Sequence, residues 1–315
     1  MKLAIVGSGM IVHTFLEMAQ ELPNTELVAL VGRAASLEKL EKMKADNNIQ
    51  KIYTDYGESL KDPEIDTVYV ALPNNMHFQT AKEALIAGKN VICEKPFTLT
   101  LAEFLELKDL AAEKDLVLVE AITNQYLENY QAIKDSIKDL GDLKIIESNY
   151  SQYSSRYDRF KQGEILPAFD PNMGGGALMD LNIYNIHFVA GILGRPEKVE
   201  YLANVERDID TSGILLLDYG ETKAVCIGAK DSSGKISSMV QGTKGYVRVE
   251  GATNTVPEVE IAGEIQNFNT HQHRMFNEFV AFEKMIREHD MAEVNKQLAH
   301  SEIVMEILQA AKDSI

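Results

Sequence analysis

Lys95 is the first residue of this sequence whose type and place could do chemistry. It follows Glu94 and a strand-like apolar run over residues 91–93, and Pro96 comes directly after it. β-Branched residues favour strands, and a proline ends a strand and biases the preceding residue toward extended or turn geometry. Ligands of open α/β sheets bind outside the carboxyl ends of the strands, so a lysine held there is a candidate catalytic group. The alternative is a surface lysine after a strand.

A second set of ionisable side chains lies on an apolar stretch, residues 177–193, which we predict to be one helix. Asp180, Tyr184 and His187 are spaced i, i+4 and i+7, which would put them on one face of an α-helix. On so apolar a helix they indicate the wall of a site rather than a solvated face. Three glycines at 174–176 precede the helix, and they allow either close backbone packing or a hinge beside a ligand.

The N-terminus contains a candidate phosphate-binding turn. A strand-like run over residues 2–6 leads through Gly7 and Gly9 into a segment with helical apolar spacing. Glycines let the backbone approach a pyrophosphate, and a helix N-terminus offers free N–H groups and the positive end of its dipole. Val12 replaces the third glycine of the full fingerprint. The expected cofactor contacts here are Gly7, Gly9, Met10 and Ile11.

The residue after the second expected strand, 26–31, bears on the choice of cofactor. A carboxylate there would accept from both ribose hydroxyls and repel a 2′-phosphate. Here the sequence has Arg33 and no carboxylate. NADP is therefore favoured, with NAD possible as the cofactor, unless Arg33 is only a solvated loop residue.

A third expected strand, residues 67–72, ends at Pro73 and Asn74, and His77 lies in the first turn of the next helix. Structural capping by His77 and a role in chemistry both remain open. The expected cofactor contacts in this region are Leu72, Pro73, Asn74, His77, Glu94 and Lys95.

Strand–helix units repeat as far as about residue 121, which predicts parallel strands with right-handed crossovers. Beyond that point strand-like runs at short spacing between 199 and 250 predict an antiparallel meander. The fold class is therefore α/β: a doubly wound Rossmann domain, 1–121, and an α+β domain, 122–315, with a large open, mainly antiparallel sheet. The last expected helix, 292–312, is a candidate to pack back toward the first domain. An open sheet face is a common dimer surface, so a homodimer through the second sheet is expected.

Composition excludes several classes of partner. The 315 residues include 31 Lys and Arg against 48 Asp and Glu, a net charge of −17, which repels nucleic acid and anionic membranes. Cys93 and Cys226 each lie in a strand-like run and read as reduced core residues, neither a disulfide nor a metal site. With no membrane-length apolar run and no signal peptide, we expect a soluble cytoplasmic protein.

In this order the motifs resemble those of the Gfo/Idh/MocA family of nicotinamide-dependent oxidoreductases along essentially the whole chain. They are Gly7-Ser8-Gly9, Ala71-Leu72-Pro73-Asn74 with His77, Glu94-Lys95-Pro96, Glu120-Ala121, and Gly174-Gly175-Gly176-Ala177-Leu178-Met179-Asp180 with Tyr184. The resemblance implies that Lys95 lies beside the nicotinamide ribose and the substrate hydroxyl, and that Asp180 is the family's site carboxylate. Tyr184 stands where many members have an acid–base histidine, as in the branch similar to glucose–fructose oxidoreductase and dimeric dihydrodiol dehydrogenase. This chain has Gln125 at a position where many members of that branch have an arginine.

The expected reaction is hydride transfer between NADP(H) and a secondary alcohol of a small molecule, namely a sugar, polyol or related diol. The hydroxyl proton would pass to Tyr184 or Lys95, and Asp180 would orient either group or accept from a substrate hydroxyl. A cationic neighbour stabilises a phenolate, and burial favours a neutral lysine, so each group would help the other. The expected substrate contacts are Tyr126, Arg156 and His187.

Two other classes stay open. One is a cofactor-binding regulator that has lost turnover, which the departures at Val12 and Gln125 permit. The other is an NAD-dependent glycosidase, which oxidises and re-reduces its sugar within one cycle. The presence of both Lys95 and Tyr184 favours the dehydrogenase.

Overall fold

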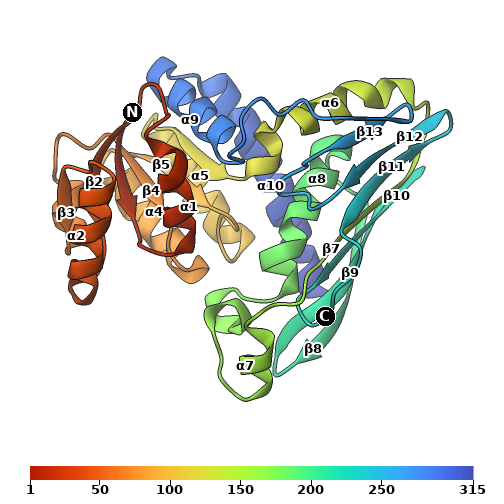
Figure 1. Ribbon diagram of the computed structural model, residues 1–315, viewed down its shortest axis with the longest axis horizontal. Helices are drawn as coiled ribbons and strands as arrows, with labels where there is room; N and C mark the ends of the chain where they lie inside the picture. Colours follow the sequence, from red (N-terminus) through yellow and green to blue (C-terminus); the bar gives the residue numbers. More distant parts are fainter. Residues whose placement is uncertain (315) are drawn as a thin grey trace. The chain divides into compact units, whose positions relative to one another are not determined.

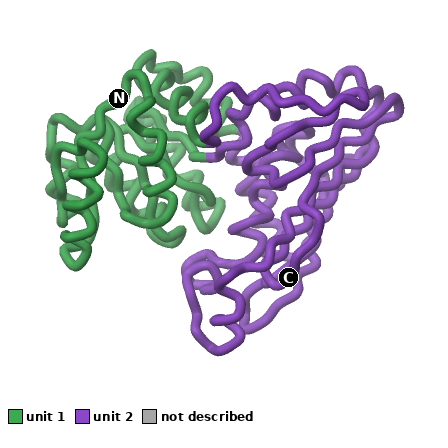
Figure 2. The backbone as a smooth tube through the Cα atoms, in the orientation of Figure 1, with its two compact units in different colours: residues 1–121, 275–299 green, residues 122–274, 300–315 purple. Residues whose placement is uncertain are grey.

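The chain forms two compact units in the computed structural model, which describes residues 1–314. Unit 1 comprises Met1–Ala121 and Met275–Ala299, and unit 2 comprises Ile122–Arg274 and the described residues from His300 onward (Figure 2). The expectation of one continuous second domain over 122–315 is therefore wrong, because the segment 275–299 belongs to unit 1.

Unit 1 is built on a parallel sheet of six strands in the order β3-β2-β1-β4-β5-β6. The strands are β1 (Lys2–Val6), β2 (Glu26–Val31), β3 (Lys51–Tyr53), β4 (Thr67–Val70), β5 (Asn90–Glu94) and β6 (Leu118–Ala121). Strands β1, β2, β4 and β5 are almost wholly buried, as expected of strands covered on both faces, which read as continuous apolar runs. This strand order is that of the Rossmann fold.

Helices surround this sheet, and one of them comes from the far end of the chain. They are α1 (Met10–Ala19), α2 (Leu37–Asp46), α3 (Tyr56–Leu60), α4 (His77–Ile86), α5 (Leu101–Glu113) and α9 (Phe276–Glu288). Phe279 of α9 lies with its ring centroid 4.5 Å from that of Phe15 and 5.1 Å from that of Tyr69. All three rings are fully buried. Burial of these aromatic side chains is what holds the segment 275–299 in unit 1.

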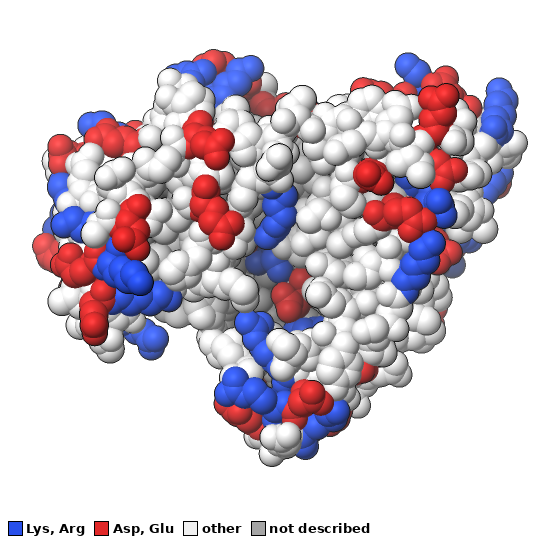
Figure 3. Space-filling view, in the orientation of Figure 1, with Lys and Arg blue, Asp and Glu red and all other residues white. Residues whose placement is uncertain are grey.

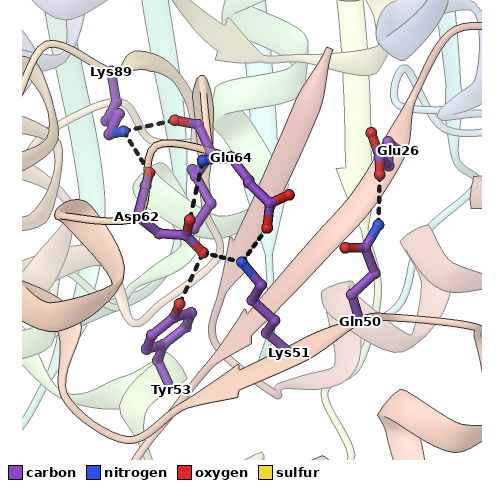
Figure 4. A network of polar contacts seen from close by, with 8 residues as sticks. Glu26, Gln50, Lys51, Tyr53, Asp62, Glu64 and Lys89 are labelled. Atoms are coloured by element: carbon purple, nitrogen blue, oxygen red, sulfur yellow. Dashed lines mark hydrogen bonds and ion pairs between the residues drawn. The ribbon is translucent and has the colours of Figure 1, made fainter.

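A polar network ties the edge strand β3 to the loop before β4 (Figure 4). Lys51 Nζ lies 2.7 Å from Asp62 Oδ2 and also pairs with Glu64. The Tyr53 hydroxyl donates to the same Asp62 oxygen at 2.8 Å. Lys89 donates to the backbone carbonyls of Asp62 and Ile65. The network satisfies buried polar groups at an edge that otherwise has one unpaired strand side.

Unit 2 is built on an eight-stranded sheet in the order β14-β13-β12-β11-β7-β10-β9-β8. The strands are β7 (Leu143–Ser151), β8 (Lys198–Glu206), β9 (Ile209–Tyr219), β10 (Thr222–Ala229), β11 (Ser237–Gly242), β12 (Gly245–Glu250), β13 (Val259–Ile261) and β14 (Glu264–Gln266). All neighbours are antiparallel except β7 and β10, which run parallel. The expected simple meander is wrong at this point, because β7 is inserted between β10 and β11.

Figure 1 shows the helices of unit 2 on one face of this sheet. They are α6 (Glu128–Ser136), α8 (Ile183–Leu193) and the second part of α10 (Met291–Asp313), whereas α7 (Tyr157–Lys161) lies in the loop after β7. Within residues 1–314 one helical stretch, 171–193, is long and apolar enough to cross a membrane by length and composition alone, and 72% of its most apolar window is buried. The expectation that the chain has no membrane-length apolar run is therefore wrong for this stretch, although the core helix of a globular unit passes the same test when it is mostly buried.

Candidate active site

The glycine turn after β1 forms an open cradle at the start of α1. Gly7 has φ +128°, and a Cβ there would overlap the Ala71 carbonyl oxygen at the end of β4, so only glycine lets the two strand ends meet. Gly9 is the N-cap of α1 and makes no side-chain cap hydrogen bond. A Cβ at Gly9 would meet nothing within 4 Å. The first amides of α1, at Met10 and Ile11, therefore begin beside open space, which fits a pyrophosphate.

Two cations lie near the end of β2. Arg33 is exposed and is the N-cap of a short 3₁₀ turn, Ala34–Ser36. Lys39, in the first turn of α2, donates from its ammonium to the Ser8 carbonyl oxygen of the glycine turn. Sequence reasoning singled out Arg33 and missed Lys39, because only the fold brings α2 beside the glycine turn.

His77 joins the loops that follow β4 and β5. Its Nδ1 lies 2.8 Å from the Pro96 carbonyl oxygen and its Nε2 lies 2.9 Å from that of Leu72. The side chain is 0% exposed, and burial lowers the pKa of His77. With both ring nitrogens facing backbone carbonyls and no exposed surface, His77 holds the loops in place. This corrects the prediction that it contacts the cofactor directly.

The strand end around Lys95 is braced by buried carboxylates. Glu94 is buried, and its Oε1 accepts from the Tyr69 hydroxyl at 2.5 Å. Glu120 Oε1 accepts from the Phe97 amide at 3.2 Å. Lys95 itself is half-buried, and the Lys95–Pro96 peptide bond is cis. Contact of Lys95 and Glu94 with a cofactor stays a prediction, as it does for Leu72, Pro73 and Asn74.

The candidate site of unit 2 begins with a π-helical turn, Leu178–Asn182, which continues into α8. A π-turn holds one residue more than an α-turn, so α-helical spacing does not hold across it. The Asp180 side chain is 36% exposed, Tyr184 is 8% exposed and His187 is 0% exposed. The prediction that the three side chains share one face and form the wall of a site is therefore wrong for His187.

His187 instead packs inside unit 2. Its Nδ1 lies 2.9 Å from Nε2 of His300 on α10, and its carbonyl oxygen accepts from the Gln125 side chain at 3.0 Å. Asn124 donates in the same way to the Tyr184 carbonyl oxygen at 2.9 Å. Buried as it is, His187 cannot bind substrate as predicted. Gln125 supports α8, so its departure from the family pattern has a structural explanation.

The glycines before the π-turn serve close packing, and the hinge alternative finds no support. Gly176 has φ +103°, and a Cβ there would overlap the Asp210 carboxylate. Asp210 accepts from the Leu178 amide and from the Tyr201 hydroxyl, both at 2.7 Å. Burial raises the pKa of Asp210. Asp210 thus fixes the start of the turn that carries Asp180.

A buried lysine that sequence reasoning missed contacts Asp180. Lys230 follows β10 directly, its side chain is 2% exposed, and its Nζ lies 2.9 Å from Asp180 Oδ2. The two residues are 50 positions apart in the chain. An isolated lysine at a strand end gives no signal in the sequence that would assign it to Asp180.

The remaining predicted substrate contacts lie on loops of unit 2. Tyr126 is half-buried at the end of a 3₁₀ turn, Thr123–Tyr126. Arg156 is exposed at the N-cap of α7. Their roles stay predictions. Among residues 1–314 no group of three or more His, Cys, Asp or Glu side chains could hold a metal ion.

The strand order of unit 1 and the open glycine turn before α1 are typical of a nicotinamide-dependent oxidoreductase. Comparison with known families agrees: residues 1–122 match the NAD-binding Rossmann fold of an oxidoreductase family, and residues 130–248 match the GFO/IDH/MocA C-terminal domain. The chain belongs to the Gfo/Idh/MocA family. The resemblance inferred from the motifs is thereby confirmed.

Two curated relatives match along nearly the whole chain. The NADP(+)-dependent scyllo-inositol 2-dehydrogenase IolU of Bacillus subtilis is 30% identical over 320 residues, covering 99% of this chain and 96% of the relative. The trans-1,2-dihydrobenzene-1,2-diol dehydrogenase of Mus musculus is 28% identical over 327 residues, covering 99% and 96%.

Among solved structures, the 3-ketoreductase KijD10 of Actinomadura kijaniata, in complex with NADP and TDP-benzene, superposes with a TM-score of 0.87 at 21% identity. The match covers 100% of this chain and 97% of that chain. At this identity the likeness concerns the fold alone, and it confirms the predicted α/β fold class.

Proposed function

We propose that this protein transfers hydride between NADP(H) and a secondary alcohol, or the matching carbonyl, of a sugar, polyol or diol. The observation that carries the proposal is its full-length similarity to two dehydrogenases whose named substrates are an inositol and a 1,2-diol. Both names describe ring compounds with hydroxyls on adjacent carbons. A cyclic compound with adjacent hydroxyls is therefore the first substrate class to test.

The cofactor, when bound, supplies the nicotinamide carbon that accepts or donates hydride. The uncapped N-terminus of α1 and the open space at Gly9 support binding of its pyrophosphate. Arg33 and Lys39 supply positive charge for a 2′-phosphate, and β2 is not followed by a carboxylate that would repel one. These features support NADP over NAD.

The proton of the substrate hydroxyl passes to Tyr184 or Lys95, and Asp180 orients the acceptor or accepts from a second substrate hydroxyl. Support comes from the placement of two of these groups: Lys95 is at the carboxyl end of β5, and Asp180 is accessible on its π-turn. Ligands of parallel sheets bind at such strand ends, and π-turns are frequent at functional sites. Reduction of the carbonyl runs the same transfers backward.

We also propose a homodimer formed through the open face of the second sheet, and a cytoplasmic location. The dimer is supported by outward-facing apolar residues on that sheet: Ile145, Leu202, Ile214, Leu216 and Tyr246 are all exposed. The location is supported by two buried free cysteines, Cys93 and Cys226.

The first experiment is a fluorescence titration with NADPH and, separately, NADH, followed by an absorbance assay with NADP⁺ and a set of inositols, sugars and trans-diols. Tight NADPH binding and NADPH formation with one of these compounds are expected. Release of a sugar aglycone without net change in NADPH would indicate the glycosidase class. Binding of neither nucleotide by folded protein would contradict the proposal and favour the regulator.

A further inference from the structure

Lys230 stands out among the buried polar residues because its ammonium group contacts three residues from two different segments of unit 2. Besides Asp180 Oδ2 at 2.9 Å, its Nζ donates to the Ala168 carbonyl oxygen at 2.5 Å. The ammonium also lies 4.5 Å from the centroid of the Phe169 ring, within range of a cation–π contact. A buried ammonium is costly without such partners, so this arrangement fixes the lysine in one place.

The backbone of Lys230 is fixed as well. Its amide donates to the Thr211 carbonyl oxygen of β9 at 2.8 Å, and its carbonyl oxygen accepts from the Ser154 amide at 2.8 Å. Ser154 lies in the loop after β7, two residues before Arg156. Lys230 therefore contacts both ends of the segment 152–170, since Ser154 lies near its start and Ala168 and Phe169 near its end.

The same segment has its own apolar core. The rings of Phe160 and Phe169 stack with centroids 4.9 Å apart, and Tyr157 lies 5.8 Å from Phe169. Ile209 completes this buried cluster. Because Phe169 contacts both Lys230 and Phe160, a shift of the segment is expected to move the partners of the lysine.

We propose that Lys230 is a positioning residue that fixes the Asp180 carboxylate. It also couples this carboxylate to the segment 152–170, which contains the predicted substrate contact Arg156. The inference rests on the proposed function, because it assigns a role to the site in which Asp180 acts. The exposed fractions of the two side chains indicate different roles. The Asp180 side chain is 36% exposed and can meet a substrate hydroxyl, whereas the Lys230 side chain is 2% exposed and acts only through Asp180. A cation beside a carboxylate favours the ionised form, which only accepts hydrogen bonds.

A double-mutant cycle tests this coupling with Lys230→Met, Asp180→Asn and the pair combined. Misplacement of a site group by about 1 Å can cost on the order of 10²-fold in rate, so Lys230→Met is expected to lower kcat by about 10- to 100-fold. In the Asp180→Asn background the same change is expected to cost less than about twofold, because coupled residues are not additive. The Kd for NADPH is expected to stay unchanged in all three variants.

The pH profile of kcat/KM separates positioning from a merely structural role. Without its cation a carboxylate takes up a proton more easily, so the acid limb in Lys230→Met is expected to move to higher pH. The charge of Lys230 also acts on the buried Asp210 carboxylate, so the move should be absent when Asp180 is already replaced by Asn. Lys230→Arg keeps the positive charge, so its acid limb is expected to stay at the wild-type pH. This variant also keeps the test possible if Lys230→Met folds poorly. Lys235→Met, which removes an exposed lysine paired with Glu250, is the matched control and is expected to behave as wild type.

Two results would overturn the role of Lys230: losses in kcat that simply multiply in the double variant, or an acid limb that does not move in Lys230→Met. Turnover by the wild-type protein would still uphold the proposed function in either case. A wild-type protein that binds NADPH but oxidises none of the compounds would overturn the proposed function, and the role of Lys230 with it.

Discussion

His77 shows how a titratable side chain can serve a site without touching a ligand. A neutral imidazole carries one N–H, yet both nitrogens of His77 face carbonyl oxygens, at Leu72 and Pro96. Two such acceptors favour a charged ring, but burial lowers the pKa of His77 and is the larger effect. The lowered pKa favours the neutral ring, which can donate only one of these two hydrogen bonds. What it contributes is a fixed distance between the loops that follow β4 and β5.

Lys95 is the residue on which turnover is expected to depend most directly. Replacing Lys95 with Met should leave NADPH binding largely intact and lower kcat by about 10²-fold or more, because a proton carrier at the reacting hydroxyl is lost. Steady-state kinetics and nucleotide titration on the same preparation measure both quantities. Lys114→Met, at an exposed lysine just after α5, is the control; full activity in the Lys95 variant would remove this lysine from the mechanism.

Arg33 and Lys39 are expected to set the preference between the two nicotinamide cofactors. A charge-assisted hydrogen bond contributes roughly 1.5–3 kcal/mol, so Arg33→Ala and Lys39→Ala should each raise the Kd for NADPH by about 10- to 100-fold. The Kd for NADH should change little, because NADH has no 2′-phosphate. Lys42→Ala, at an exposed position of the same helix α2, serves as control. Equal weakening of both nucleotides would contradict the assignment.

At the scale of elements, the network at β3 makes the stability of unit 1 sensitive to acid. The hydrogen bond from Lys51 is the main reason that the pKa of Asp62 falls to about 2. Since this folded-state pKa lies below the ordinary value of 3.8, the stabilisation is complete above about pH 4 and is lost as the pH falls through about 2.

Asp62→Asn tests the network. The Asp62 side chain is only 6% exposed, so its loss should lower the free energy of unfolding at pH 7 by about 1–3 kcal/mol. The gap between variant and wild type should close as the pH falls below about 4. Urea denaturation over a pH series measures this; Glu58→Gln, in an exposed pair with Lys61, should show little change. If the difference in free energy of unfolding between variant and wild type does not change with pH, the charge of Asp62 does not contribute to stability.

The same scale explains which parts of the fold could be predicted from the sequence. Strands β1, β4 and β5 were predictable because buried parallel strands are continuous apolar runs, and Lys95 was found because it ends one of them. The exposure of His187 was predicted wrongly because residues 183–190 of α8 are buried on every side of the helix, which helical periodicity alone does not reveal. Lys230 was missed because its contact with Asp180 depends on pairing across 50 residues. The place of β7 was missed for the same reason, since strand order across a sheet is a long-range property.

At the scale of the whole molecule, the acidic net charge disfavours binding to polyanions, and an apolar row on the second sheet is a candidate surface for self-association. The net charge is −17, and Figure 3 shows acidic and basic side chains mixed over the face in view. The outer face of the second sheet instead carries a row of apolar neighbours: Ile214 of β9 is paired with Leu202 of β8 and with Ile227 of β10.

This row is expected to lie in the dimer interface. Ile214→Glu combined with Leu216→Glu should convert the protein to a monomer, because buried unpaired carboxylates are strongly disfavoured. Light scattering at low concentration, with a melting curve to check folding, measures the outcome. Leu37→Glu changes an exposed leucine on α2 in unit 1 and should leave the mass unchanged. A wild-type protein that is already monomeric would rule out the dimer.

The contribution of α9 to unit 1 has a consequence for how this protein can be recombined with its relatives. The chain passes from one unit to the other three times, after residues 121, 274 and 299, so the units are not two consecutive modules. A chimera joined once, near residue 121, would pair a native Phe15 and Tyr69 with a foreign residue in place of Phe279. Exchange of substrate units among homologues therefore requires three junctions, with residues 275–299 retained from the parent that supplies the nucleotide-binding sheet.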